Sequence, residues 1–183
     1  MTEKEKMLKG EMFNPCDKEL SAERVVCKQL CSEYNATPYA EKDKRAGILS
    51  KIITHRGKNC VIEPNFYCDY GYNIEVGDNF YVNHNSVFLD VALIKFGSNV
   101  LVGPCCGFYA VSHPFDKDER NKGREYGMPI TVGNNVWIGG SVCVLGGVTI
   151  GDNVIIGAGS VIVKDIPDNT VAVGNPCRVI REL

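Results

Sequence analysis

The chain has 183 residues, and its 20 Lys and Arg against 22 Asp and Glu give a formal net charge of -2 at pH 7. This length predicts one domain with a small appendage, and a near-neutral charge without a basic tail argues against a nucleic-acid partner. Because the charged N-terminal run holds no apolar stretch, we expect neither a signal peptide nor a membrane contact, and we expect a cytoplasmic protein.

Residues 1–57 predict a helical cap that differs in kind from the rest of the chain. Apolar and charged patterns predict three helices, at residues 3–10, 21–34 and 41–54. Ser21 is the expected N-cap of the second helix, and His55 is expected at the end of the third. We expect this cap to cover the open end of the following domain, and to help shape a substrate pocket.

Residues 58–183 predict a solenoid, because the sequence repeats every six residues. An aliphatic residue opens each unit, at Val132, Ile138, Val144, Ile150, Ile156 and Ile162. Helices have a period near 3.6 and single strands a period of 2, so a period of six indicates short strands wound into coils with one aliphatic position always inward. An ordinary β-sandwich would space its strands irregularly, at ~8–12 residues, and would not hold one phase over so many units.

The same phase is present earlier, in residues 76–87 and 96–107, and weaker units lie near Pro64 and Tyr70. Between Phe88 and Phe96 the spacing is eight, which predicts a bulge of two residues near position 90. Gly at the second position of a unit and Asn or Gly at the fourth suit turns that need positive φ.

The aliphatic pattern fails in residues 112–129, which predicts a long inserted loop rich in charged and turn-forming residues. Loops longer than ~12–15 residues in compact domains are usually functional. His113 stands at the entrance of this loop, followed by Pro114, which restricts the backbone before it. We therefore expect His113 to act as a general base, with its ring oriented by Glu125 or by a backbone carbonyl.

No metal site is expected. Three histidines, at positions 55, 84 and 113, include no closely spaced pair of the kind that zinc sites use. The nine cysteines contain no CxxC pair, although Cys27 and Cys31 fall one helical turn apart. In a reducing compartment they are most simply small apolar side chains, and a catalytic cysteine is left open as the alternative.

Several motifs in a fixed order resemble the maltose and galactoside O-acetyltransferase family: YCDYGYNI (67–74), FYVNHNSVFLD (80–90), the SHPFD loop entrance, GNNVWIGGSV, GGVTIGDN, VIVKDIP and VGNPCRVI. The resemblance covers nearly the whole chain and is greater to the maltose than to the galactoside enzymes. It implies a mainly β fold, a left-handed parallel β-helix of hexapeptide repeats with three repeats per coil, an N-terminal α-helical cap and a long inserted loop. It also implies acetyl-CoA as co-substrate and a homotrimer with its sites between subunits.

The resemblance further implies direct acetyl transfer to a hydroxyl of maltose, glucose or a related sugar, without an acyl-enzyme. His113 matches the catalytic base, and the residues placed around the acceptor are Asn83, Asp69, Asp17 and Glu125. Asp17 is included because the chain has Pro15 and Val91 where the galactoside enzymes have acceptor-binding aspartates.

Seven residues match the coenzyme site of the family: Trp137, Gly140, Ala158, Val163, Lys164, Arg178 and Arg181. Positive charge near the last coils suits the phosphates of CoA, and glycine-rich turns leave room for its thin pantetheine arm. Trp137, the only tryptophan, occupies an outward position of its unit.

Two other functions stay open at this point. One keeps acyl transfer but changes the acceptor to an amine, an antibiotic or serine, which a panel of acceptors would distinguish. The other is a non-catalytic solenoid that binds a partner, which would need neither His113 nor a basic coenzyme site.

Overall fold

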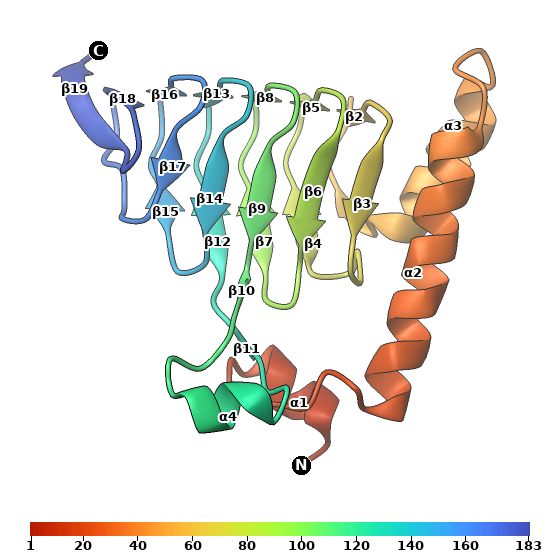
Figure 1. Cartoon of the computed structure of the whole chain (residues 1–183). Helices are drawn as coiled ribbons and strands as arrows, with labels where there is room; N and C mark the ends of the chain where they lie inside the picture. The colour runs from red at the N-terminus through yellow and green to blue at the C-terminus, as the bar shows by residue number, and fades with distance from the viewer.

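The computed structural model describes residues 1–183 as a β-solenoid of triangular cross-section closed at one end by helices (Figure 1). Successive coils contribute strands to three sheets, here called the first, second and third faces, and the strands pair in parallel except for the last two of the second face, which pair antiparallel. Strands of the third face descend at the front of Figure 1 while the coils advance to the left, so the winding is left-handed. The expected fold class is confirmed.

The strands of each face are hydrogen-bonded neighbours. The first face contains β1 (His55–Arg56), β4 (Ile74–Val76), β7 (Ile94–Phe96), β12 (Ile130–Val132) and β15 (Thr149–Ile150). The second contains β2 (Val61–Ile62), β5 (Phe80–Val82), β8 (Val100–Val102), β13 (Trp137–Ile138), β16 (Val154–Ile156), β18 (Thr170–Val173) and β19 (Arg178–Glu182). The third contains β3 (Phe66–Cys68), β6 (Ser86–Leu89), β9 (Gly107–Tyr109), β14 (Cys143–Leu145) and β17 (Val161–Ile162).

The register of the strands explains the repeat. Cys143 pairs with Val161, 18 positions later, so a regular coil is three hexapeptides. Tyr67 pairs with Val87, 20 positions later, because the early coils carry two extra residues. The six aliphatic residues that open the units are all at most 1 % exposed: Val132, Ile138, Val144, Ile150, Ile156 and Ile162.

Phenylalanines fill the core of the earlier coils. The rings of Phe66 and Phe108 both meet Phe88 edge-on, with centroids 5.2 and 4.7 Å away. At the turns between the first and second faces, asparagines in the left-handed region form a ladder of side-chain hydrogen bonds of 2.8–3.0 Å: Asn59, Asn79, Asn99 and Asn135. The fourth position of the repeat therefore supplies both the positive φ and the amide that links one coil to the next.

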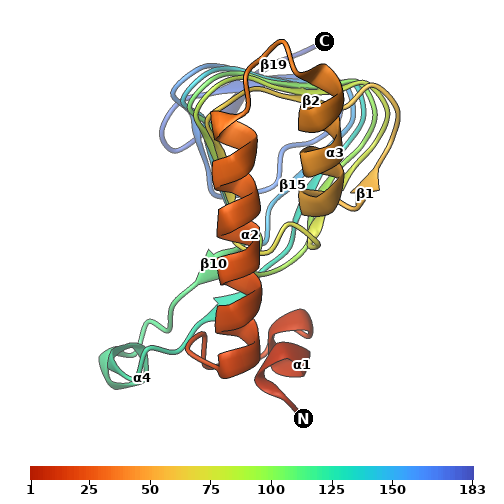
Figure 2. The ribbon, with the colours of Figure 1, turned by 90° about the vertical axis from the view of Figure 1, so that its right-hand side faces the viewer.

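Helices α1 (Glu3–Leu8), α2 (Lys18–Ala36) and α3 (Lys42–Ile52) form the cap, and α2 and α3 cover the open end of the first coil (Figure 2). The prediction of Ser21 as N-cap is wrong. Helix α2 starts earlier because the Asp17 carboxylate accepts the main-chain N–H groups of Glu19 and Leu20 at 3.0 and 3.4 Å. His55 does not end a helix but begins strand β1.

The inserted segment is a folded hairpin rather than an open loop. Strands β10 (Val111–Ser112) and β11 (Tyr126–Gly127) pair antiparallel, and α4 (Lys117–Asn121) lies between them. The hairpin projects from the solenoid next to α1 (Figure 1). None of the helices combines the length and the apolar character that crossing a membrane requires.

Candidate active site

All extra residues of the coils gather at one corner of the prism, between the third and first faces. We call it the loop corner; it comprises residues 69–73, 90–93 and 110–129. The buried Asp90 carboxylate holds it together, because it accepts main-chain N–H groups from Asp69 and Tyr70 at 2.9 Å and from Gly71 at 2.7 Å. Burial raises the pKa of Asp90 to about 6, although these N–H donors act to lower it.

His113 projects from this corner with its side chain 53 % exposed. Its Nδ1 lies 3.2 Å from the carbonyl oxygen of Arg124. A carbonyl only accepts hydrogen bonds, so in the neutral ring Nδ1 carries the proton and Nε2 keeps its lone pair. Of the two orienting groups considered from the sequence, the carbonyl holds Nδ1, while the Glu125 carboxylate lies 4.0 Å from Nε2.

The N-terminal segment fixes Glu125 through its main chain. The N–H of Phe13 donates to the carbonyl oxygen of Glu125 at 2.9 Å, and the reciprocal bond measures 3.2 Å. Burial raises the pKa of the Glu125 carboxyl, His113 lowers it, and the nearby charge of Asp69 raises it again. Three groups expected at the site, His113, Glu125 and Asp69, are thus neighbours in one chain.

The side chains of Arg24 and Lys28 on α2 lie near Asp69, and the sequence did not predict them there. Arg24 on α2 donates from Nη1 to the hydroxyl of Tyr70 at 2.6 Å. Burial raises the pKa of Asp69, and the charges of Lys28 and Arg24 lower it. Arg24 is one of the polar residues of an amphipathic helix. Its place in that pattern does not indicate that it contacts residues about 45 positions later in the chain.

One oxygen of the Asp17 carboxylate, Oδ1, accepts the main-chain N–H groups of Glu19 and Leu20 that cap α2. The expected role of Asp17 at the acceptor stays a prediction.

The remaining candidates lie elsewhere on the chain. Asn83, Gly140 and Ala158 occupy the corner between the second and third faces, which we call the far corner (residues 83–85, 103–105, 139–141 and 157–159). Trp137 points outward from the second face, 56 % exposed, in register with Ile155. The same outward row continues through Val171 to Arg181.

Three further coenzyme candidates lie outside the far corner. Arg178, like Arg181, is exposed on β19, where it pairs with Val173. Val163 and Lys164 follow β17 at the end of the third face, and both are exposed. A single chain therefore does not bring the far-corner residues to His113.

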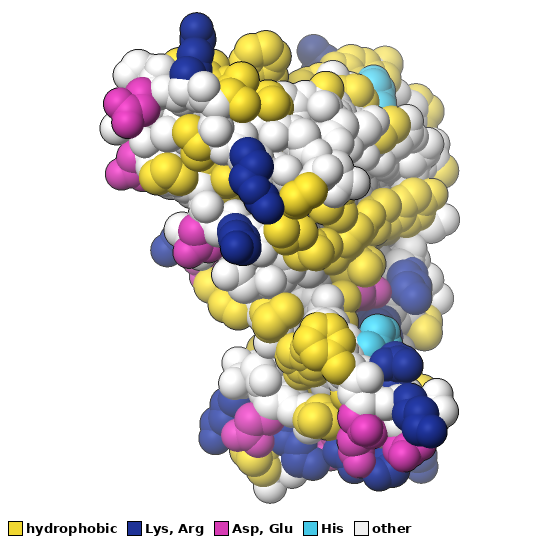
Figure 3. Space-filling model, turned by 60° about the vertical axis from the view of Figure 1, so that its left-hand side comes forward, with side chains coloured by type: hydrophobic (Ala, Val, Ile, Leu, Met, Phe, Trp, Pro, Cys, Tyr) yellow, Lys and Arg dark blue, Asp and Glu magenta, His cyan; other side chains and the backbone are white.

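The three faces differ sharply in their outward side chains. The first face is polar, with His55, Glu75, Lys95, Thr131 and Thr149 in one row. The second face carries an apolar row: Val61, Tyr81, Leu101, Trp137, Ile155 and Val171. The third face is also apolar, with Tyr67, Val87, Cys143 and Val161 in one row and Leu89, Tyr109 and Leu145 in the next. In Figure 3 hydrophobic side chains form a band along the solenoid above the lobe that holds α4.

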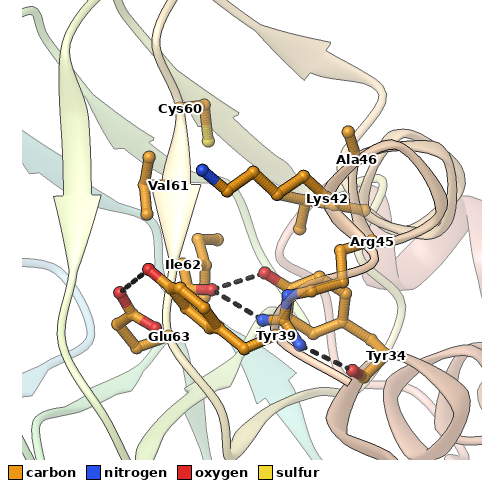
Figure 4. A pocket seen from close by; sticks show the side chains of 10 residues that line it. Tyr34, Tyr39, Lys42, Arg45, Ala46, Cys60, Val61, Ile62 and Glu63 are labelled. Carbon is orange, nitrogen blue, oxygen red and sulfur yellow. Dashed lines mark hydrogen bonds between the residues drawn. The ribbon is translucent and has the colours of Figure 1, made fainter. Parts of the chain in front are cut away.

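A separate pocket of about 280 Å³ lies between α2, α3 and β2. Figure 4 shows Arg45 between Tyr34 and Tyr39, where it donates to the carbonyl oxygens of Tyr34 and Thr37 at 3.1 Å. These bonds join α3 to α2 within the cap, and the cap is joined to the first coil by the Tyr34 hydroxyl and by Arg45 Nη2, at 3.5 Å, which both donate to the carbonyl oxygen of Ile62 on β2. Because none of the site residues expected from the sequence lines this pocket, we regard it as a structural joint.

Comparison with known proteins agrees with this architecture. Residues 6–57 match the maltose acetyltransferase hexapeptide capping motif, and residues 129–164 match the bacterial transferase hexapeptide of six repeats. The galactoside O-acetyltransferase of Escherichia coli K12 is 42 % identical over 98 % of this chain and 88 % of its own length.

Solved structures agree equally well. A maltose O-acetyltransferase from Clostridium difficile 630 superposes with a TM-score of 0.98 at 52 % identity, covering 100 % of this chain and 98 % of that one. A hexapeptide-repeat-containing acetyltransferase of Vibrio cholerae O1 biovar eltor, in complex with acetyl coenzyme A, gives a TM-score of 0.92 at 38 % identity, covering 100 % and 99 %.

The fold, the capping motif and these relatives define an acetyltransferase built on hexapeptide repeats, with acetyl-CoA as its co-substrate. Within that class, the chain belongs to the maltose and galactoside O-acetyltransferase family. It is therefore an acyltransferase enzyme, which sets aside the non-catalytic solenoid.

Proposed function

We propose that the enzyme transfers acetyl from acetyl-CoA to a hydroxyl of maltose, glucose or a related sugar, with His113 as the general base. The observation that carries this proposal is the hydrogen bond between His113 Nδ1 and the carbonyl oxygen of Arg124, which leaves Nε2 free to take a proton. The names of the relatives, a galactoside and a maltose O-acetyltransferase, support the sugar acceptor.

In this mechanism the sugar oxygen attacks the thioester carbonyl carbon while its proton moves to Nε2 of His113. The tetrahedral intermediate then collapses, the carbon–sulfur bond breaks, and the imidazolium returns the proton to the CoA thiolate. Glu125, 4.0 Å from Nε2, stabilises the imidazolium between these two transfers. Asp69, beside Arg24 and Tyr70, supplies hydrogen-bond acceptors for other sugar hydroxyls.

We also propose a homotrimer in which the second face of one subunit packs on the third face of the next. Two extended apolar faces on one chain favour burial against other copies, while the polar first face suits solvent. A contact between two different faces closes into a ring when the rotation allows it. Phe115 supports this arrangement, since it is 93 % exposed on the hairpin that would reach the neighbour.

Such packing would complete the site. The loop corner with His113 borders the third face, and Asn83 and Trp137 border the second, so the contact would bring them together across subunits. The coenzyme would lie in the groove between them, with Gly140 offering its main-chain N–H and Ala158 and Val163 lining the arm. Lys164, Arg178 and Arg181 would meet the phosphates at the last coils.

A thiol-release assay with acetyl-CoA and a panel of maltose, glucose, a galactoside, an aminoglycoside and serine tests the acceptor. We expect turnover with the sugars. Preference for an amine would overturn the sugar assignment while leaving acetyl transfer intact.

The base is tested with His113→Ala, which should lower kcat by roughly 10²–10⁴ because general-base catalysis contributes that much. Acetyl-CoA binding by calorimetry should stay nearly unchanged. His55→Ala, on the polar first face, is the matched control and should keep full turnover. Retained turnover in the His113 variant would exclude it as the base.

A further inference from the structure

Three buried thiols meet at the joint between the cap and the solenoid. Cys27 and Cys31 lie one turn apart on the same side of α2, and Cys68 ends strand β3. The Sγ atom of Cys68 is 3.5 Å from that of Cys27 and 3.8 Å from that of Cys31. All three sulfurs lie within 4.8 Å of one another, and none of the three residues is more than 4 % exposed.

These distances suit one ion at the centre of the three sulfurs. With a metal–sulfur bond of ~2.3 Å, three sulfurs in a trigonal arrangement lie ~4 Å apart. The observed spacing approaches this value without a rearrangement of α2 or β3. We propose that Cys27, Cys31 and Cys68 form a binding site for a soft monovalent cation, copper(I), held by three sulfurs between the cap and the first coil.

The ligand set selects the ion. No fourth His, Cys, Asp or Glu joins the three thiols. Structural zinc sites are closed by four protein ligands, whereas soft thiolates alone suit copper(I). Two carboxylates lie close to the thiols: Asp90, which accepts three main-chain N–H groups, interacts through its charge with Cys27 and Cys68, and Asp69 interacts with Cys31. Their negative charge favours a cation nearby. No electron is transferred on binding: copper–sulfur bonds form as the thiol protons leave to solvent.

An entry path is present. Cys27 lines a hollow of about 340 Å³ between α2 and the loop corner, together with Val26, Tyr70 and Tyr72. An ion entering there would reach the Cys27 sulfur first. Once bound, it would fasten α2 to the first coil at two points of the helix.

The test titrates the full-length, reduced protein anaerobically with copper(I) in the presence of bicinchoninate, a competing chelator. The wild type should retain one equivalent, and Cys68→Ser should retain at least tenfold less. Cys105→Ser, which alters an exposed thiol at the far corner, is the matched control and should behave like the wild type. Equal retention by the wild type and Cys68→Ser, or no retention by the wild type, would overturn the proposal.

X-ray absorption of the 1:1 complex keeps the proposal testable should Cys68→Ser fail to fold. Three sulfur neighbours are expected, and two in a linear arrangement would overturn it. Binding should also raise the Tm of the wild type by roughly 5–10 °C at 100-fold excess over Kd, by linkage. No such rise is expected for Cys68→Ser.

Discussion

Replacing Glu125 with Gln tests the proposed role of its charge. At 4.0 Å a carboxylate and an imidazolium attract by ~4 kcal/mol at an effective dielectric constant of 20 and by ~1 kcal/mol in water. His113 is half exposed, so we take about 1–2 kcal/mol. Because the imidazolium forms only during the reaction, kcat should fall by roughly 5–30-fold. The hydrogen bonds between Phe13 and Glu125 use main-chain atoms, so the substitution should leave the hairpin in place.

The split between kcat and KM separates this electrostatic role from a merely structural one. Because the carboxylate acts on the imidazolium that forms during the reaction, its loss should lower kcat and leave the KM values for acetyl-CoA and for the acceptor nearly unchanged. Glu119→Gln is the matched control, because it removes a carboxylate from α4 that pairs only with Lys122. An unchanged kcat in Glu125→Gln, or an equal fall in the Glu119 variant, would refute this reasoning.

Three further predictions concern stability and the coenzyme. Asp90→Asn should lower the free energy of unfolding by about 1–3 kcal/mol, because the new amide group would face the N–H of Gly71. The folded-state pKa of Asp90 is raised to about 6, so the difference in the free energy of unfolding between wild type and variant should shrink as the pH rises from about 4 to 6 in denaturant titrations. A difference that does not depend on pH would contradict this. Gly71→Ala should lower the free energy of unfolding by more than about 2 kcal/mol, because φ is +78° and a Cβ would overlap the Ile52 carbonyl. The control Gly47→Ala, in open space on α3, should instead raise it by about 0.5–1 kcal/mol, and thermal melts measure both. Arg178→Ala should raise the KM for acetyl-CoA several-fold more than it lowers kcat in steady-state assays; the reverse split would remove it from the coenzyme site.

The solenoid could be predicted from the sequence because every hexapeptide unit has the same requirement for an apolar inward residue. One inward position per six residues must be aliphatic, and the opening residues from Val132 to Ile162 are indeed buried. A pattern repeated so often cannot be satisfied by chance. The bulge near Asp90 was visible for the same reason, as a break in an otherwise fixed phase.

Features that depend on contacts between distant segments were not visible. The start of α2 was misplaced because Asp17 and Ser21 are both good N-cap residues, and only the fold decides between them. Likewise, the helical spacing of Cys27 and Cys31 gave no hint that Cys68 completes the cluster. The pairing of the N-terminal segment with the inserted hairpin has no local signal at all.

The location of the candidate site follows from the regularity of the rest. In a regular coil most inward side chains are apolar and the faces are flat, so a cluster of charged groups forms more readily where a coil departs from 18 residues. Here the extra residues of successive coils lie next to one another at one corner. Asp90 is one of the extra residues after β6, and its carboxylate accepts main-chain N–H groups of the extra residues after β3. The hairpin that carries His113 begins at the same corner in the next coil. The N-terminal segment pairs with Glu125 and so holds this hairpin close to the solenoid. The imidazole thus projects from a column of irregular turns, and the buried Asp90 carboxylate fixes the first of these turns through its main-chain N–H groups.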